Sequence, residues 1–532
     1  MNTISRRAFL RQASAFAGMG VAAPLGLNLA TMGQAAAQSS QGDYRALVNI
    51  FLYGGNDAYN TLLATDTDSW GHYVDHRDPA SRLIGDGSTS IALMRPGTAP
   101  NLSAALTTPA RLGGVLPISQ ANRGPNAGRT FALHPMLSGL QGIHQQGRLA
   151  AVANVGPLNQ PLTKAGFLGN ADRPAKLFSH NDQQSTWQSL APEGAEAGWG
   201  GLMADLLMSQ NGTGTYAPLI QRSFTCISPG NQSLWLTGQH VKALQTGSLG
   251  VNTLAEENTV LEDTNVQQAL MAMMATQTPT NLFAAEHQAI VQRGVAAGAL
   301  MSGVLAGLSS ADGGNTPWAS AGQWNPWADP LMHYISPIDL QPRFNYLALQ
   351  LQMVARLIDA NRLGNLGIKR QVFMVTLGGF DQHDSLNREH ADRMAQLDHA
   401  MAYFDRVLSN MPVGDMRNQV TTFTASEFGR SLTNNGDGTD HGWGAHHFVM
   451  GGAVQGGQVY GRYPQLATAD ADGQFDSPDL IQNGVMLPST SVDQLAYTLG
   501  RWMGVSNSNL LDILPHLSEF DASTHDLGFM GA

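Results

Sequence analysis

Short runs of apolar and β-branched residues recur along the chain, and each ends in a polar, glycine-rich turn. Such runs predict buried strands, and the stretches between them carry apolar residues at helical spacing. Strands are predicted at 47–53, 149–154, 372–377, 420–424 and 447–450, and helices at 344–360, 389–408 and 492–503. Strands that alternate with helices form a largely parallel sheet covered by helices on both faces. The chain is therefore predicted to be an α/β protein.

The middle of the chain has a different composition. From about 228 to 339, Met, Ala, Gln and Thr dominate, and helices are predicted at 266–276 and 282–305. We interpret this segment as a mostly helical insertion in a single α/β domain that spans residues 43–532.

Residues 1–37 have the pattern of an export signal. Their only charges are arginines, the run Ser5–Leu10 (SRRAFL) contains a pair of them, and small residues at 35–37 offer a cleavage site. This pattern predicts a twin-arginine signal peptide. The alternative, a membrane anchor, is disfavoured because Pro24 and Asn28 interrupt the apolar stretch. We expect a periplasmic or otherwise exported protein that meets the twin-arginine export machinery and has no integral membrane segment in its mature chain.

The charge balance and the cysteine count exclude two classes of protein. With 29 basic and 40 acidic residues the net charge is −11, which argues against a nucleic-acid partner. The single cysteine, Cys226, can form neither an intrachain disulfide nor a cysteine-rich metal site. Only 13% of the residues are charged. Acids and histidines that gather at strand ends are therefore candidates for function.

Carboxylates and imidazoles occur in the turns that follow several predicted strands. Because the carboxyl ends of parallel strands meet at one edge of a sheet, we expect these side chains to lie together. The mixture suits zinc, manganese or iron(II). The alternative is that the aspartates form Asx-turns and the histidines pack against backbone carbonyls. The candidate metal ligands are Asp57, Asp381, His383, Glu427, Asp440 and His441.

Two further side chains are candidates for catalysis. Ser179 lies in the segment Leu177–Trp187. If a helix begins there, its positive end could bind an anion and the serine hydroxyl could act as a nucleophile, or Ser179 could simply cap the helix. Arg430 could bind an anionic substrate with two hydrogen bonds, or it could pair with Glu427.

Several motifs together resemble a known family. Besides the twin-arginine start and Ser179-His180, they are Gly54–Asp57 (GGND), Gly378–His383 (GGFDQH), Ser426–Arg430 (SEFGR) and Gly438–Gly442 (GTDHG). In this order they resemble the exported bacterial proteins of domain of unknown function 1501. That resemblance implies the alkaline phosphatase-like fold, a three-layer sandwich with a largely parallel central sheet flanked by helices. It also implies one or two divalent metals at the carboxyl edge and a hydroxyl nucleophile.

The family pattern implies roles for individual residues. Asp57 resembles the metal aspartate after the first strand, Asp381 and His383 resemble the Asp and His of one metal site with a shorter spacing, and His441 resembles the late metal histidine. Ser179 takes the place of the nucleophile by position only.

One position departs from that pattern. Phe428 follows Glu427 where the phosphatases have a histidine. The second metal therefore lacks a ligand unless Asp440 or His446 supplies it.

The sequence thus predicts an exported metal-dependent hydrolase that acts on a small anionic substrate, a phosphate or sulfate ester, with zinc or manganese as the cofactor. In the alternative, the protein is a non-catalytic exported binding or scaffold protein that keeps the fold and one metal, which the histidine missing at Phe428 favours. A third interpretation takes Asp381, His383 and His441 as a two-histidine, one-carboxylate iron site.

Overall fold

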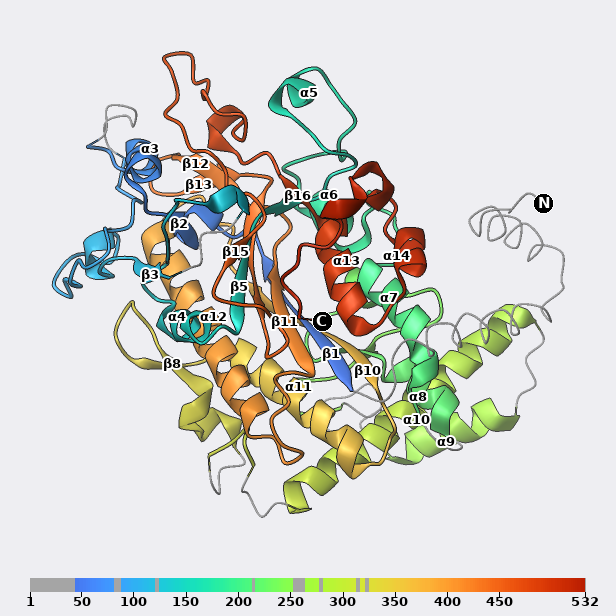
Figure 1. The fold of residues 1–532 in the computed structure, drawn as a ribbon. Helices are drawn as coiled ribbons and strands as arrows, with labels where there is room; N and C mark the ends of the chain where they lie inside the picture. Colours follow the sequence, from blue (N-terminus) through green and yellow to red (C-terminus); the bar gives the residue numbers. More distant parts are fainter. Residues whose placement is uncertain are drawn as a thin grey trace, which may run out of the picture.

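The computed structural model describes residues 44–80, 88–119, 124–212, 216–251, 264–276, 281–311, 316–320 and 325–531. The predicted signal peptide lies outside these residues. A nine-stranded sheet forms the centre of the molecule (Figure 1), in the order β15-β5-β14-β11-β1-β10-β6-β7, with β16 also paired to β5.

The central strand is β1 (Arg45–Tyr53), which pairs in parallel with β10 (Arg370–Gly378) on one side and β11 (Val420–Ala425) on the other. Beyond β10 follow β6 (Cys226–Ser228) and β7 (Leu244–Gln245), both parallel to their neighbours. The carboxyl ends of these five strands therefore meet at one edge of the sheet.

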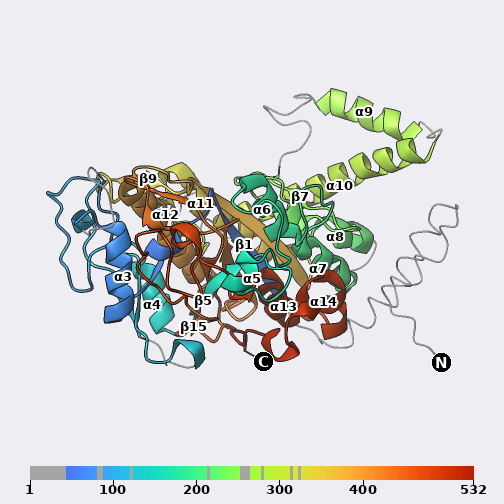
Figure 2. The same ribbon diagram turned by 90° about the horizontal axis from the view of Figure 1, so that it is seen from above.

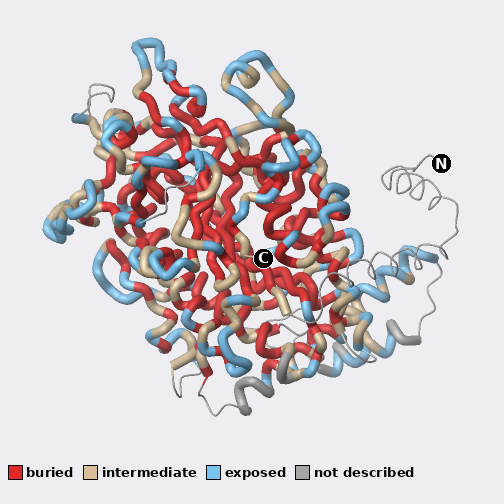
Figure 3. Tube along the Cα trace, in the orientation of Figure 1, coloured by how far each residue is buried: buried red, intermediate tan, exposed pale blue. Residues whose placement is uncertain are grey.

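Helices cover both faces of the sheet. Alternate residues of a strand point to opposite faces: Val48 and Ile50 belong to one core, and Leu47 and Phe51 to the other. The first core includes residues of α4 (Ser138–Gln145), α11 (Tyr346–Leu363) and α12 (Leu386–Ser409). The second includes residues of α6 (His180–Ser189), α7 (Trp199–Leu207), α13 (Val492–Met503) and α14 (Asn507–Ile513). Figures 2 and 3 show the layers and their buried centre, which confirms the α/β class.

The sheet is mixed, so the prediction of a largely parallel sheet is wrong. Strand β14 (Ala445–Met450) runs antiparallel to both β11 and β5 (Leu149–Gly156). A parallel connection needs a long crossover, usually a helix. Only the short ribbon of β12 (Arg430–Asn434) and β13 (Thr439–His441) lies between β11 and β14, and the chain returns antiparallel.

The remaining elements surround this core. They are the strands β2 (Leu62–Ala64), β3 (Leu116–Ile118), β4 (Phe131–Leu133), β8 (His333–Ile335), β9 (Pro342–Phe344), β15 (Val459–Tyr460) and β16 (Thr490–Ser491) and the helices α3 (Thr67–Arg77), α5 (Lys164–Leu168) and α8 (Ala217–Ser223). Each predicted strand and helix of the α/β core is present, with ends that differ by a few residues.

The segment predicted as a helical insertion contains α9 (Thr264–Thr276) and α10 (Leu282–Ala311), which extend away from the body (Figure 2). Strands β7 and β8 also lie in this segment, and β7 belongs to the central sheet. Among the described residues, one helical stretch, Leu282–Ala306, is long and apolar enough to cross a membrane. Of its most apolar 18 residues, 22% are buried inside the protein. Ala297 and Met301 of this stretch are fully buried in the core, as in a helix of a folded domain.

Candidate metal site

Five polar side chains meet where β1, β10 and β11 end. Asp381 and His383 lie in the turn after β10, and Glu427 lies in the turn after β11. His441 ends β13, and His180 is the first residue of α6. The sheet edge therefore brings together residues that are up to 261 positions apart, His180 and His441.

The distances define one compact cluster. Asp381 Oδ1 lies 3.0 Å from His383 Nε2 and 3.2 Å from His441 Nε2, and Asp381 Oδ2 lies 3.4 Å from His180 Nε2. The Nε2 atoms of His383 and His441 are 3.0 Å apart. Two ligand atoms on a tetrahedral zinc, each about 2.05 Å from the ion, are about 3.3 Å apart. The donors of His180, Asp381 and His441 all lie within 4.8 Å of one another, a spacing that fits a single small cation.

Two of the histidines are oriented by partners on the far side of their rings. His441 Nδ1 lies 2.7 Å from the carbonyl oxygen of Phe178, and His180 Nδ1 lies 3.0 Å from Glu427 Oε1. In the neutral rings, each Nδ1–H donates to that oxygen and the Nε2 lone pair points toward Asp381. Within the described part of the chain, His180 Nε2 is buried and has no hydrogen-bond partner. Metal-bound histidines are held by their second nitrogen in this way.

The pKa shifts report the charges around the cluster. The hydrogen bond from His180 to Glu427 raises the pKa of the His180 imidazole, whereas burial lowers that of His441. Burial alone would raise the pKa of Asp381, but the hydrogen bond and charge of Arg430, with His383 and His180, hold it below its ordinary value. The carboxylates that favour a proton on His180 also favour a divalent cation beside it.

Glu427 acts behind the cluster. Its Oε1 accepts hydrogen bonds from the amide of Gly54 at 2.9 Å and the side chain of Gln184 at 3.1 Å, in addition to the contact with His180. The side chain is fully buried. The structure therefore places Glu427 as the partner that orients His180.

Asp57, a predicted metal ligand, lies in a buried ion pair. Its two carboxylate oxygens accept hydrogen bonds from Arg77 at 2.5 Å and 2.9 Å, and both side chains are almost completely buried. Arg77 also donates to the carbonyl oxygens of Ser431 and Leu432 at the start of β12. The structure therefore does not bring Asp57 together with the histidines.

Arg430, which the sequence suggested as a binder of an anionic substrate, is also hydrogen-bonded within the protein. Nη1 donates to Asp381 Oδ1 at 2.9 Å and to the carbonyl oxygen of Gly54, while Nε and Nη2 donate to the hydroxyl and the carbonyl oxygen of Thr439. The side chain is fully buried. Its position suits it to hold the carboxylate of Asp381 in place, and the predicted pair with Glu427 is not formed.

Asp440 and Ser179 lie next to the cluster. Asp440 Oδ1 is 3.6 Å from His383 Nδ1 and accepts a hydrogen bond from Asn435 at 2.9 Å. Ser179 is the residue before α6; its hydroxyl donates to Asp182 Oδ2 at 2.7 Å and accepts no capping hydrogen bond from a backbone N–H group. Ser179 thus stands beside His180 with its hydroxyl held by a carboxylate.

His180 is the site residue that the sequence analysis left unassigned, although it stands in the Ser179-His180 motif. The signal that could have found it is its place in the first helical turn, where a side chain can reach the edge of the sheet. Phe428 occupies the place of the expected second histidine, with its ring centroid 4.8 Å from that of His180 and 4.7 Å from that of His441. His446 lies apart from the cluster, buried against Tyr463.

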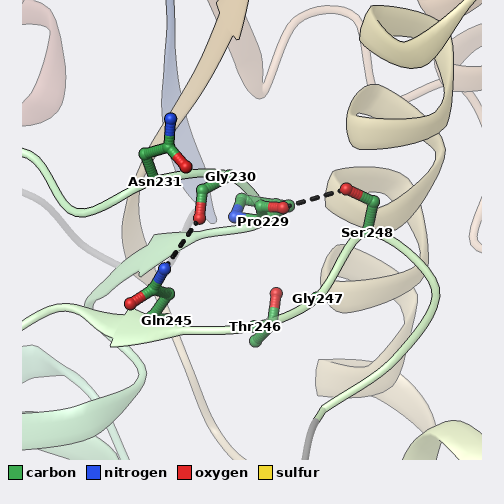
Figure 4. A pocket seen from close by; sticks show the side chains of 7 residues that line it. All are labelled: Pro229, Gly230, Asn231, Gln245, Thr246, Gly247 and Ser248. Atoms are coloured by element: carbon green, nitrogen blue, oxygen red, sulfur yellow. Dashed lines mark hydrogen bonds between the residues drawn. The ribbon is translucent and has the colours of Figure 1, made fainter. Parts of the chain in front are cut away.

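A cavity of about 480 Å³ lies where β6 and β7 end (Figure 4). Gln245 and Ser248 donate hydrogen bonds to the backbone oxygens of Gly230 and Pro229, at 3.2 Å and 3.1 Å. The Thr246 hydroxyl is buried and has no partner among the described residues. The lining carries no charged side chain; it consists of Pro229, Gly230, Asn231, Gln245, Thr246, Gly247 and Ser248.

This cavity and the histidine cluster share one sheet edge, because β6 pairs in parallel with β10.

Comparison with known proteins adds one match. No curated protein matches the chain. The family model for the proteins of unknown function called DUF1501 matches residues 44–514, which include every residue of the cluster. The chain therefore belongs to the DUF1501 family.

Proposed function

We propose that the cluster binds one divalent transition metal ion, zinc or manganese, and that the protein is an exported hydrolase of phosphate or sulfate esters. The ligands would be His180 and His441 through Nε2 and Asp381 through its carboxylate, with His383 Nε2 standing beside them, 3.0 Å from Asp381 Oδ1. A bound divalent ion supplies Lewis acidity toward an ester oxygen. The alkaline phosphatase-like fold and export by the twin-arginine route belong to this proposal, supported by the sequence motifs.

One observation supports metal binding above the others. The Nδ1 atoms of His180 and His441 are already hydrogen-bonded to oxygen atoms, so their Nε2 lone pairs point toward the carboxylate of Asp381. Lone pairs and a carboxylate repel one another unless a proton or a metal ion lies between them, and a divalent ion can satisfy several of these donors at once. The orphaned Nε2 of His180 supports the same conclusion.

The donors support one metal site rather than two. Asp57 is neutralised by Arg77, and Asp440 reaches the cluster at the far nitrogen of His383, Nδ1. Among the described residues, one group of three possible ligands, His180, Asp381 and His441, gathers within metal-binding distance. The remaining residues would hold this site in shape: Glu427 orients His180, and Arg430 orients Asp381.

Metal analysis tests the first half of the proposal. Protein purified without chelators should hold about one zinc or manganese ion per chain, measured by inductively coupled plasma mass spectrometry. Because each side chain that binds the ion directly contributes strongly to affinity, Asp381→Asn and His441→Asn should bind the ion at least about tenfold more weakly in calorimetry. His333→Gln, a histidine of β8 outside the cluster, should bind it like the wild type. A protein that takes up no metal overturns the proposal.

Hydrolysis is tested separately, because a scaffold protein with one metal would pass the first test. Aryl phosphate monoesters, phosphate diesters and sulfates are offered to the metal-loaded protein and to Asp381→Asn. Turnover that disappears in the variant supports the hydrolase. Metal binding without turnover of any ester favours the non-catalytic alternative. That alternative is supported by the hydrogen bonds of Arg430 to Asp381 and of Ser179 to Asp182, which occupy these side chains within the protein.

A further inference from the structure

Arg393 of α12 approaches the turn that carries the metal site. A Cβ atom built on Gly379 would lie 2.8 Å from Arg393 Nε, 3.3 Å from its Cζ and 3.4 Å from its Nη2. Gly379 has a φ of +93° and stands two residues before Asp381. The guanidinium therefore lies directly against the backbone two residues before Asp381, and a Cβ atom at position 379 would displace it.

This guanidinium has no partner in the described part of the chain. Among the described residues, no carboxylate lies within 4.0 Å of it and no group accepts a hydrogen bond from its nitrogens, although Nε is buried. Asp392, the adjacent residue of the helix, accepts hydrogen bonds from the hydroxyls of Tyr334 and Ser336 and from the side-chain amide of Gln396. Leaving the buried Nε–H group of this cation without a hydrogen-bond acceptor costs free energy. An anion that is not part of these residues would remove that cost.

The other arginines near the cluster differ in this respect. Arg430 is saturated by Asp381, Gly54 and Thr439, and Arg77 by Asp57. They already fulfil a role in the fold, whereas Arg393 has no such partner in the part of the chain that the structure describes and can bind a ligand.

The space beside this turn is open. Gly378 and Gly379 are both exposed, and a Cβ atom on Gly378 would meet no atom within 4 Å. Thr376, two residues before Gly378 on the same strand, is bound through its backbone: its N–H group donates to Gln350 Oε1 and its carbonyl oxygen accepts from Gln350 Nε2. The same Gln350 side chain lies against Gly230 of the uncharged cavity. The end of β10 thus adjoins the cavity at Thr376, Arg393 at Gly379 and the cluster at Asp381.

We infer that Arg393 is a specificity-determining residue that binds an oxyanion group of the substrate beside the metal site, in the role that the sequence suggested for Arg430. A guanidinium presents two parallel N–H donors to the oxygens of a phosphate, sulfate or carboxylate. This inference rests on the proposed function only in taking the anion as part of the substrate, since binding of the anion needs no catalysis.

The test measures the affinity of the full chain for inorganic phosphate by calorimetry, with and without bound zinc. Loss of a charge-assisted hydrogen bond costs enough to weaken binding about tenfold in Arg393→Gln. Arg393→Lys keeps the positive charge but lacks the paired N–H donors of a guanidinium, so its phosphate affinity should lie between those of the wild type and Arg393→Gln. Gly379→Ala, which displaces the guanidinium, should match Arg393→Gln. The control is Arg388→Gln, because Arg388 is exposed, lies on the same helix and pairs with Glu389; it should bind phosphate like the wild type.

The outcomes separate this inference from the proposed function. If zinc does not bind but the metal-free protein binds phosphate through Arg393, the proposed function fails and the anion site stands. If zinc binds and Arg393→Gln binds phosphate as tightly as the wild type, the anion site is wrong and the metal site stands. A wild-type chain that binds no phosphate in either form also overturns the inference.

Discussion

Asp57 illustrates how the partner of a residue decides its role. It ends the turn after the first strand, where a metal ligand was expected, but its carboxylate lies against Arg77 of α3 with both side chains buried. The two residues are 20 positions apart in sequence, so the sequence has no helical spacing that would predict the pair. The pair holds the turn after β1 against the start of β12, which Arg77 also binds through backbone oxygens.

The substitution Asp57→Asn separates a structural from a metal-binding role. It leaves the Arg77 charge buried without a counter-ion, and breaking such a pair costs about 3–5 kcal/mol of unfolding free energy. We expect a loss of this size in urea unfolding, with zinc affinity unchanged in the molecules that remain folded. The control is Asp68→Asn, whose side chain is 88% exposed and should change stability by less than about 0.5 kcal/mol. A variant that unfolds like the wild type but loses zinc would instead place Asp57 in the metal site.

Sequence reasoning found most of the cluster because strand ends share one edge of a sheet. Asp381, His383 and His441 meet there as expected. The N-terminal residues of α6 were harder to assign, because a serine and a histidine at the start of a helix look the same whether they cap the helix or serve a site. Arg393 had no sequence signal, since its approach to Gly379 depends on how α12 packs against the sheet.

At the scale of elements, the turn after β1 depends on close backbone contact with the turn after β10. Gly54 has a φ of +116°, and a Cβ atom there would lie 2.4 Å from the amide nitrogen of Asp381. Gly55 has a φ of +83°, and its Cβ would overlap the ring of Phe428. These glycines let the two turns pack together, which brings Asp381 and the amide that binds Glu427 into one site.

Gly54→Ala should therefore disturb both stability and metal binding. The positive φ alone costs about 1–2 kcal/mol, and the overlap with Asp381 adds to it. We expect a lower urea midpoint together with zinc affinity reduced by about tenfold, since Asp381 must move. Gly97→Ala is the matched control: its φ is +83°, but a Cβ there would meet nothing within 4 Å. It should lose stability only, and equal zinc loss in both variants would contradict the assigned role of the turn.

The strands themselves were predictable, but not all of their directions. Buried strands read as continuous apolar runs whether their neighbours run parallel or antiparallel, so His447–Met450 revealed a strand and not its orientation. The direction of β14 follows from the short β12–β13 ribbon before it, which carries no helix. The same limitation applies to the insertion, where the two-residue strand β7 is too short to leave a pattern.

At the scale of the whole molecule, buried neutral histidines make the fold sensitive to acid. Burial lowers the pKa values of His390, His446 and His447 to about 3. In the unfolded chain a histidine has a pKa of about 6.5. Below that pH the unfolded chain binds protons that the folded chain does not, so the stability present above pH 6.5 is lost as the pH falls toward 3.

His447→Leu and His447→Gln should both reduce this sensitivity, because neither side chain takes up a proton. Both ring nitrogens of His447 are buried without a partner in the described structure, and the ring packs edge-on against Trp187. Between pH 7.5 and pH 5, each variant should lose about 2 kcal/mol less unfolding free energy than the wild type. Urea unfolding at both pH values measures the difference. Variants that follow the wild-type decline would show that His447 is protonated in the folded state.

The central position of β1 has a consequence for how the chain comes to fold. This strand is synthesised long before the two strands that flank it, which begin only at Arg370 and Val420. Contacts between segments so far apart form slowly, because a long loop must close first. Until then the apolar run from Ala46 to Leu52 has no partner, and unpaired strands of this kind aggregate. The nascent chain should therefore depend on chaperones until most of it has left the ribosome.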